Sequence, residues 1–192
     1  ATIPILPLRN TVLFPGVVIP ITVARDKSIQ LVKDAYRQKE RLIGVVAQRN
    51  PNVEAPEFED LYNVGSLAAI LRLIRMPDGS VTIVIQGRQR VHIDEFTEHD
   101  PYIHARITAL QEVEPSPDES RAMMMTLKNE ASRIIDMSPN IPSEANVMLH
   151  NINSLSFLVH FITSNLNLEV AQKQAILEEN HLLTKAGIVL EH

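Results

Sequence analysis

The 192-residue sequence contains no cysteine and no tryptophan, and it has only six glycines. The absence of cysteine excludes a disulfide scaffold and a cysteine-ligated zinc site. Neither G-x-x-x-x-G-K-[ST] nor G-x-G-x-x-G occurs. Because such glycine-rich loops cradle the phosphates of bound nucleotides, the sequence predicts no cofactor-binding site of this kind.

Patterns typical of catalytic and metal sites are also missing. The chain has no H-E-x-x-H and no G-x-S-x-G, and its seven histidines are scattered. His150 and His160 share a predicted helix, but a ten-residue spacing turns them about 80° apart. We therefore predict no catalytic residue and no metal site, and we do not expect this chain to be an enzyme by itself.

No apolar run reaches the roughly 18–20 residues that a membrane helix requires. The apolar stretch "ILPLRNTVLFPGVVIPI" (5–21) is interrupted by Arg9, Asn10 and Thr11 and contains four prolines. It also lacks the basic segment that opens a signal peptide. The sequence therefore predicts no membrane association, and the absence of thiols fits a cytoplasmic protein.

The formal net charge of −5 disfavours a general nucleic-acid binder, because phosphate binding needs a basic field. Residues 1–110 hold 13 Lys+Arg and 12 Asp+Glu, whereas residues 111–192 hold 5 and 11, which indicates two parts with different surfaces. Four arginines lie on predicted strands or next to them: Arg72, Arg75, Arg88 and Arg90. They either form a site for an anion or RNA or solvate the outer faces of the strands, and we favour the second interpretation.

The first part, residues 1–113, is predicted to be mainly β-structure. One helix is expected over Lys27–Lys39 with Asp26 as its N-cap, and a helix between strands is typically a crossover connection. Phe14-Pro15-Gly16 and Pro77-Asp78-Gly79 predict turns, and Gln86–Arg90 predicts a bulge or a corner. The expected strands are Ile3–Leu8, Val17–Val23, Leu42–Ala47, Gly65–Met76, Ser80–Gln86, Val91–Phe96 and Ile103–Val113. The fold class is therefore α+β, with a curled β-sheet or pseudo-barrel containing one crossover helix.

The second part, residues 114–189, is predicted to be an α-helical bundle. The pattern Ser116-Pro117-Asp118-Glu119 is a capping box that starts a helix. A long helix is expected over Ser143–Leu166, a third over Glu169–Glu179, and a fourth is expected to be capped by Asn180. Met123-Met124-Met125 either packs in the core or forms an adaptable binding surface, and we favour the core. Residues 190–192 are interpreted as the start of a cloning scar.

Four segments of the sequence together resemble the N-terminal domain of Lon, the ATP-dependent protease. They are "LPLRNTVLFPGVVIPITVARDKSI" (6–29), "GVVAQRN" (44–50), "VGSLAAILRLIRMPDGSVTIVIQGRQRVHI" (64–93) and "AQKQAILEENHLLTKA" (171–186). A stand-alone Lon-N-type domain, in an interaction or RNA-binding module, is the alternative.

The resemblance implies a PUA-like β domain followed by a helical bundle. It also implies that the AAA+ ATPase, with its ATP and Mg, and the Ser-Lys protease domain lie outside this chain, so no catalytic residue is carried over. The expected role is recognition of unfolded or degron-bearing protein substrates and support of homo-hexamer assembly in the bacterial cytoplasm. A purely structural role in assembly is a further alternative.

Five apolar residues are the candidates for substrate contact. Val12, Leu13 and Phe14 flank the first turn, where they either touch an apolar client segment or plug the β domain. Phe157 and Phe161 widen the apolar surface of the predicted long helix beyond one stripe. We favour core packing for the first group, because burying one phenylalanine contributes roughly 1.5–3 kcal/mol.

Overall fold

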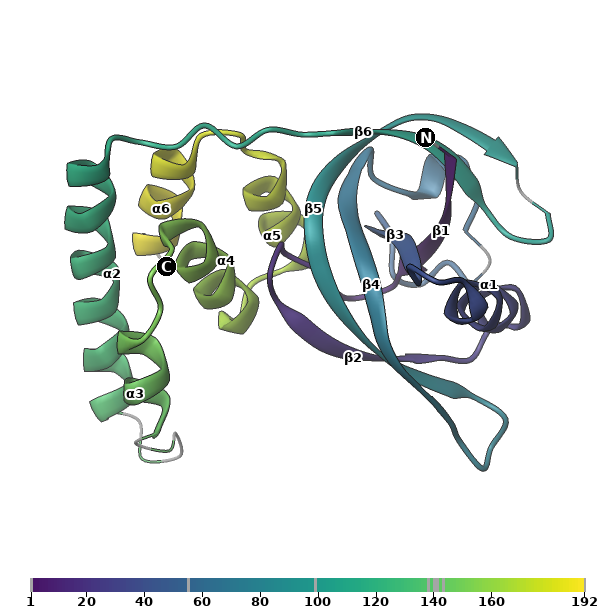
Figure 1. Ribbon diagram of the computed structural model, residues 1–192, viewed down its shortest axis with the longest axis horizontal. Coiled ribbons are helices and arrows are strands. Elements are labelled where there is room, and N and C mark those ends of the chain that lie inside the picture. Colours follow the sequence, from purple (N-terminus) through teal and green to yellow (C-terminus); the bar gives the residue numbers. More distant parts are fainter. Residues whose placement is uncertain are drawn as a thin grey trace. The chain divides into compact units, whose positions relative to one another are not determined.

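The computed structural model describes residues 2–54, 56–98, 100–137, 139, 142 and 144–191. The chain forms two compact units (Figure 1). Unit 1 comprises residues 1–111 and 168–178, and unit 2 comprises residues 112–167 and 179–192. Unit 1 is built on a sheet, and the secondary structure described in unit 2 is helical apart from a short bridge, as the α+β prediction required.

Unit 1 contains a six-stranded mixed sheet with the order β2-β5-β4-β3-β1-β6. An additional pairing of β5 with β6 joins five of these strands, β5-β4-β3-β1-β6, into a closed circuit and leaves β2 at an edge. The strands are β1 (Thr2–Leu8), β2 (Val18–Val23), β3 (Leu42–Ala47), β4 (Val64–Arg75), β5 (Val81–Glu98) and β6 (His104–Ala109).

Helix α1 (Asp26–Arg37) connects β2 to β3 and buries Leu31, Val32 and Ala35. The predicted helix between the two strands is present, but β2 and β3, which it joins, do not pair with each other in the described sheet. The parallel pair is β1 with β3, and β2 runs antiparallel to β5. The predicted N-cap was wrong. Asp26 is already helical, and the cap position holds Arg25, whose side chain makes no capping hydrogen bond.

Strand β5 runs without a break through the segment that was expected to divide it. The register with β4 shifts there, since Leu67 pairs with Gln89 and Ala68 pairs with Gly87. The predicted bulge is therefore confirmed, but the two predicted strands on either side of it are one strand. A Cβ atom on Gly87 would lie 2.2 Å from the carbonyl oxygen of Phe14, so only glycine allows this close approach.

Helix α5 (Val170–Glu178) belongs to unit 1, although it follows most of unit 2 in the sequence. The buried Gln174 donates from Nε2 to the carbonyl oxygen of Val64 on β4 (2.8 Å). The buried Arg90 on β5 donates to the carbonyl oxygen of Leu177 (3.0 Å) and to that of Gln111 (3.1 Å). A guanidinium group at the carbonyl end of a helix also interacts favourably with the helix dipole.

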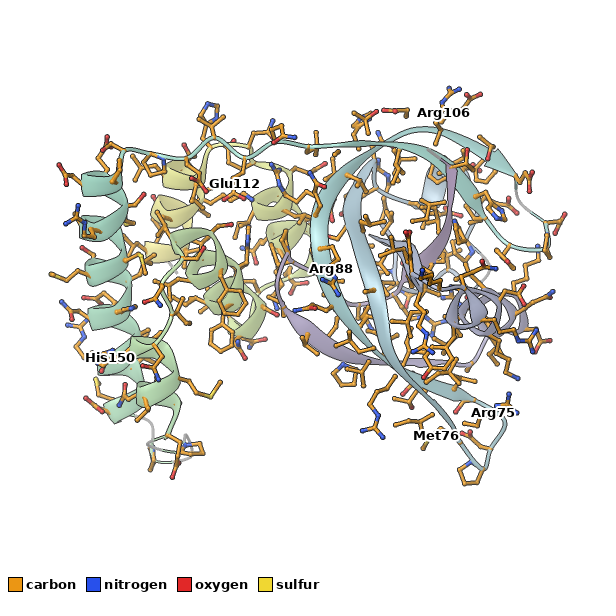
Figure 2. All side chains as sticks on the ribbon, in the orientation of Figure 1. Arg75, Met76, Arg88, Arg106, Glu112 and His150 are labelled. Atoms are coloured by element: carbon orange, nitrogen blue, oxygen red, sulfur yellow. The ribbon has the colours of Figure 1, made fainter. Side chains whose placement is uncertain are left out.

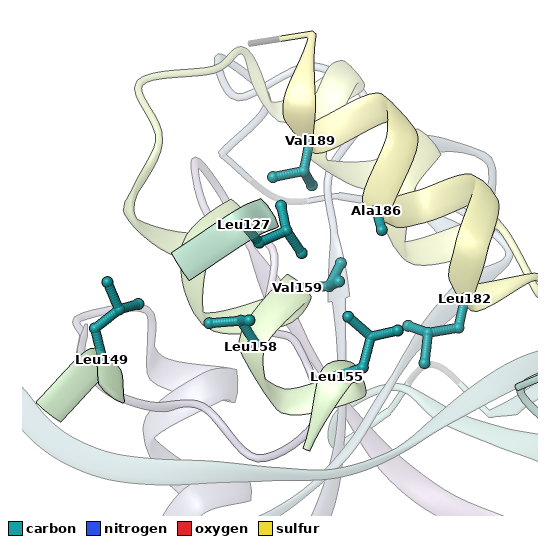
Figure 3. Close-up of a cluster of buried hydrophobic side chains, with 8 residues drawn as sticks. All are labelled: Leu127, Leu149, Leu155, Leu158, Val159, Leu182, Ala186 and Val189. Atoms are coloured by element: carbon teal, nitrogen blue, oxygen red, sulfur yellow. The ribbon is translucent and has the colours of Figure 1, made fainter. Parts of the chain in front are cut away.

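Unit 2 consists of α2 (Pro117–Met137), α3 (Glu144–His150), α4 (Leu155–Asn165) and α6 (Leu182–Leu190). They pack around one cluster of buried side chains (Figure 3). The predicted start of α2 is confirmed, because the Ser116 hydroxyl accepts from the backbone N–H of Glu119 (3.3 Å). The members of the cluster are Leu127, Leu149, Leu155, Leu158, Val159, Leu182, Ala186 and Val189.

The single long helix predicted over 143–166 was wrong, because the chain forms α3 and α4 with a break at 151–154. Ser154 caps α4 by accepting from the backbone N–H of Phe157 (3.2 Å). Lys128 donates from Nζ to the carbonyl oxygens of His150 (3.1 Å) and Ile152 (2.7 Å), which satisfies the end of α3. The apolar repeat continues across the break, so spacing alone did not show it. The predicted first residue, Ser143, lies outside the described residues.

Two further expectations concern the C-terminal segment. The cap predicted at Asn180 was wrong, since α6 begins at Leu182 and the cap position holds His181 without a side-chain capping bond. The division into domains 1–113 and 114–189 stays a prediction. The compact units of the structure differ from it chiefly because segment 168–178 belongs to unit 1. The scar interpretation also stays a prediction, because Leu190 ends α6 and His192 is not described.

Candidate functional site

The first group of candidate contact residues lies in the interior of unit 1. Val12, Leu13 and Phe14 are all buried, and Phe14 has no exposed surface. The carbonyl oxygen of Leu13 accepts from the Ser66 hydroxyl (2.7 Å), and the carbonyl oxygen of Phe14 accepts from the Val17 N–H (3.2 Å). In this conformation these side chains present no surface to a client, and a role in substrate contact stays a prediction.

The second group lies on α4 of unit 2. Phe157 and Phe161 are one helical turn apart, both are half-buried, and their ring centroids lie 5.8 Å from each other. The neighbouring Leu158 and Val159 point into the cluster of unit 2 and are fully buried. The two phenylalanines therefore form a partly exposed aromatic pair beside the core, and their role in substrate contact is also untested.

Unit 2 exposes further large apolar side chains. The methionine run illustrates this, because Met123 and Met124 pack against the cluster whereas Met125 is 67% exposed. The core interpretation of the run therefore holds for two of its three members. Among the described residues of unit 2, eight large apolar side chains are exposed: Val113, Met125, Ile134, Met137, Val147, Met148, Leu183 and Leu190.

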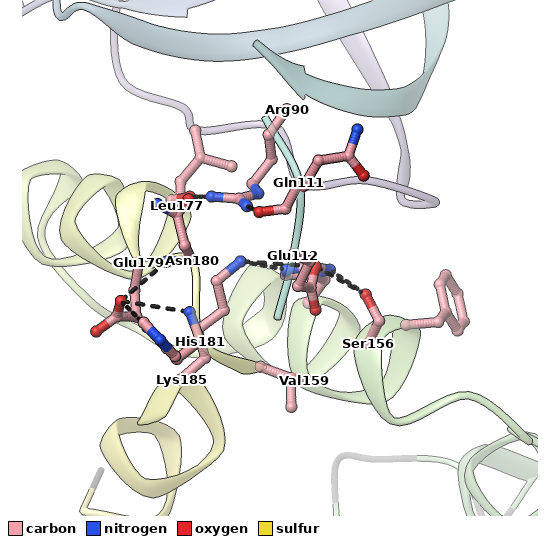
Figure 4. Close-up of polar contacts among 12 residues, drawn as sticks. Arg90, Gln111, Glu112, Ser156, Val159, Leu177, Glu179, Asn180, His181 and Lys185 are labelled. Carbon is pink, nitrogen blue, oxygen red and sulfur yellow. Dashed lines mark hydrogen bonds and ion pairs between the residues drawn. The ribbon is translucent and has the colours of Figure 1, made fainter. Parts of the chain in front are cut away.

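A buried polar cluster joins α4, α6 and the segment that leads into unit 2 (Figure 4). Lys185 is fully buried, and its Nζ lies 3.0 Å from His160 Nε2 and 4.0 Å from Glu112 Oε2. The Ser156 hydroxyl donates to the same Glu112 oxygen (3.2 Å). Sequence reasoning missed this cluster, because a lysine and a glutamate 73 residues apart carry no local signal.

Backbone bonds fix the segment that carries Glu112. The Val113 N–H donates to the carbonyl oxygen of Asn180 (2.7 Å), and the Leu182 N–H donates to the carbonyl oxygen of Val113 (2.9 Å). Nearby, the Glu179 carboxylate accepts from the backbone N–H of Asn180 (2.8 Å). Backbone hydrogen bonds, first that of His181 and then that of Asn180, hold the pKa of Glu179 below its usual value. Backbone hydrogen bonds thus connect the segment that carries Glu112 to the start of α6.

The four arginines of the strands do not form one site. Arg90 is buried and bound to backbone carbonyls, so the interpretation as a solvated residue was wrong for it. Arg72, Arg75 and Arg88 are exposed, as expected of residues that solvate strands. Figure 2 shows Arg75 and Met76 near the tip of the β4–β5 hairpin. The sheet therefore gathers no cluster of these four cations.

Two pockets lie beside the start of α1 in unit 1. The first has a volume of about 320 Å³ and is lined by residues 6–11, 20–25 and 28. The second, of about 400 Å³, shares Pro7, Arg25 and Ser28 with the first and adds Asp26 and Glu54. Sequence reasoning did not single out either pocket, although Arg9 interrupts the opening apolar stretch and was the available signal.

In the part of the chain that the structure describes, no three His, Cys, Asp or Glu side chains gather closely enough to hold a metal ion. None of the helices described has the length and apolar character needed to span a bilayer. His150 is exposed and His160 is buried in the polar cluster of unit 2.

Comparison with known sequences gives consistent matches along the whole chain. The model of the ATP-dependent protease La (LON) substrate-binding domain matches residues 2–192. The Lon protease of Cytophaga hutchinsonii is 45% identical over 193 residues, and that of Flavobacterium johnsoniae is 48% identical over 187. These matches cover 100% and 96% of this chain but only 24% and 23% of the relatives. The chain thus spans about a quarter of their length.

Solved structures show the same fold. The N-terminal domain of a Mycobacterium avium complex Lon protease superposes with a TM-score of 0.81 at 19% identity, covering 100% of this chain and 97% of that one. A Lon N-terminal domain protein from Xanthomonas campestris gives a TM-score of 0.69 at 17% identity, covering 100% and 98%. At such identities the likeness establishes the arrangement of the elements.

Proposed function

Because this chain belongs to the family of ATP-dependent protease La (LON) substrate-binding domains, we propose that it recognises unfolded or degron-bearing protein substrates for a Lon-type protease. One structural observation carries the proposal. Unit 2 leaves eight large apolar side chains exposed among its described residues, and the Phe157–Phe161 pair on α4 is half-exposed. Contiguous exposed apolar surface marks sites of protein interaction, and these side chains supply the apolar area that such a site needs.

The rest of the parent protein is part of the proposal. We place the AAA+ ATPase, with ATP and Mg, and the serine protease domain with its Ser-Lys dyad in the remaining three quarters of the parent, as the length of the curated relatives suggests. The chain then acts as a non-catalytic recognition domain in the cytoplasm of a bacterium. The closed strand circuit of unit 1 supports naming its fold a PUA-like pseudo-barrel.

Support of hexamer assembly is a second part of the proposed function. The same exposed residues of unit 2 have the chemistry to contact a second copy or the adjoining ATPase, and obligate interfaces are more apolar than transient ones. Measuring the mass of the chain from about 1 to 100 μM separates the two roles. Self-association that removes client binding assigns the surface to assembly, and a monomer that binds clients assigns it to recognition.

The test of recognition is a titration of the full 192-residue chain against a labelled, permanently unfolded protein. We expect a dissociation constant of about 10–100 μM, which corresponds to roughly −7 to −5.5 kcal/mol. The affinity should change little between low and high salt, because apolar contacts carry it. Binding of RNA, the activity of the alternative module, would instead weaken steeply with salt.

A matched pair of variants sharpens the test. Met125→Ser with Met137→Ser removes two of the most exposed apolar side chains of unit 2, whereas Met76→Ser removes an exposed one from unit 1. We expect the double variant to bind the unfolded client several-fold more weakly and Met76→Ser to bind it as the wild type does. Tight, salt-sensitive RNA binding together with no client binding would overturn the proposal.

A further inference from the structure

The smaller pocket of unit 1 has an unusual charge for a chain with a net charge of −5. Its wall contains two arginines, Arg9 and Arg25, and no acidic residue. The neighbouring pocket is different, because Asp26 and Glu54 line it together with Arg25. Of the two pockets, the first therefore offers an anion positive charge without a neighbouring carboxylate.

A buried amide fixes the position of Arg25. The Nη2 atom of Arg25 donates to Gln48 Oε1 (2.8 Å), and Gln48 is fully buried. Gln48 in turn donates from Nε2 to the carbonyl oxygens of Asn50 (3.1 Å) and Val53 (2.9 Å). A guanidinium fork whose orientation is held in this way loses little conformational freedom when it binds a carboxylate.

Arg9 lines the same pocket from a different segment of the chain, and it is exposed. Its guanidinium group makes no ion pair or hydrogen bond to any described residue. Burial and then the nearby charge of Arg9 lower the pKa of Arg25, and Glu54 opposes this effect. Two cations that repel each other across a pocket become favourable neighbours when an anion binds between them.

The edge of the sheet provides the second feature of this pocket. In the described sheet, β2 pairs only with β5, and Pro20, Ile21 and Thr22 of β2 line the pocket. The Gly87 N–H donates to the carbonyl oxygen of Val17, so alternation directs the backbone groups of Pro20 and Thr22 away from β5. Thr22 thus offers a free N–H and a free C=O to an extended peptide.

Resting on the proposed function, we propose that this pocket binds the C-terminal carboxylate of a client polypeptide. The carboxylate lies between Arg9 and Arg25, and the residues before it extend along the edge of β2. The volume of about 320 Å³ is at the lower end of the range of ligand pockets, so it takes the last one or two residues of a chain. Clients with a free, unstructured C-terminus are then preferred.

The experiment uses the full chain and an N-terminally labelled, unstructured ten-residue peptide that ends in leucine. The peptide is prepared with a free carboxylate and with a C-terminal amide, and both are titrated at low salt by fluorescence anisotropy. We expect the free acid to bind about tenfold more tightly, the size of one charge-assisted hydrogen-bonded pair. Arg9→Gln should remove this preference, and Arg25→Gln should do the same.

Matched controls separate the pocket from general electrostatics. Arg72→Gln removes the same charge from an exposed position outside both pockets, and it should keep the tenfold preference. Because Arg25 also contacts buried Gln48, thermal melting checks that Arg25→Gln is folded. The Arg9 guanidinium group is exposed and makes no hydrogen bond or ion pair to a described residue, so Arg9→Gln decides the question if the other variant unfolds.

The outcomes distinguish this inference from the function on which it rests. Equal binding of acid and amide by the wild type, or a preference that survives Arg9→Gln, overturns the carboxylate site even when an unfolded client still binds. Failure to bind the peptides and the unfolded client alike overturns the proposed function.

Discussion

Units 1 and 2 differ in the number of large apolar side chains that they leave exposed. In the larger unit 1, the described residues leave four large apolar side chains exposed, all on β2, β4 or the adjoining hairpin turn, whereas Val12, Leu13 and Phe14 before the first turn are buried. In the smaller unit 2, eight are exposed among the described residues. A sheet closed by its own pairings covers its core, whereas a few short helices cannot bury every apolar face.

The two units also differ in the partners of their buried polar side chains. In unit 1, Arg90 and Gln174 donate to backbone carbonyl oxygens, so each links two elements through the backbone. In unit 2, the partners of the buried Lys185 include an imidazole and a carboxylate. Such an ionic contact is sensitive to the loss of one partner. We infer that unit 1 provides the rigid frame and unit 2 the adaptable surface.

The largest expected effect tests the core of unit 1. Phe14→Ala should lower the free energy of unfolding by about 3–5 kcal/mol, because it leaves a cavity beside the tight Phe14–Gly87 contact. Urea denaturation measures this loss, with Phe14→Leu as a milder control. A stable Phe14→Ala protein with weakened client binding would instead indicate that Phe14 contacts the client.

The next effect tests the polar cluster of unit 2. Glu112→Ala should cost about 3 kcal/mol, because it deprives the buried Lys185 of its carboxylate partner. The double variant Glu112→Leu with Lys185→Met should recover much of this loss, since an apolar pair replaces the ion pair. Thermal melting of the single and double variants measures both. Equal losses in the two proteins would show that the cluster stabilises unit 2 only through packing.

A smaller effect separates recognition from packing within one helix. Phe157→Ala should weaken binding of an unfolded client about 3–10-fold while lowering stability by about 1 kcal/mol, because its ring is only half-buried. The neighbouring Leu158→Ala is the matched control, and it should lose about 2–5 kcal/mol of stability. If Phe157→Ala loses stability with its affinity unchanged, the aromatic pair is packing and recognition lies elsewhere.

The smallest effect is a pH dependence at the start of α6. The folded pKa of Glu179 is lowered, so its contribution to stability is present above pH about 4.5 and is lost as the pH falls through the folded pKa. Glu179→Gln should therefore lower the melting temperature by about 1–2 °C at pH 7 and have a smaller effect near pH 3. A difference that does not shrink in acid would assign the effect to something other than the charge.

The sequence predicted the elements whose signals are local. Strand Leu42–Ala47, the hairpin turn at Pro77-Asp78-Gly79 and the capped start at Ser116 all appear where alternation and turn chemistry placed them. The break between α3 and α4 escaped, because it depends on Lys128 reaching carbonyl groups more than twenty residues away. Local pattern does not contain such a contact.

The candidate site was predictable to a smaller degree. Phe157 and Phe161 stood out as an apolar excess on a helix, and the structure leaves both half-exposed. The pocket of Arg9 and Arg25 did not stand out, since its two sides meet only when β2 and the end of β1 are placed in the sheet. Sites assembled from distant segments need the topology before they can be recognised.

The return of α5 to unit 1 sets an order of events during synthesis. Strands β4 and β5 emerge early, but the helix that packs against Val64 and Arg90 is made only when residue 178 is reached. Counting from residue 111, 67 further residues must be translated, which takes about 3–13 s at roughly 5–20 residues per second. During that interval the sheet of unit 1 lacks α5, and residues 112–167 of unit 2 are synthesised before that helix is complete.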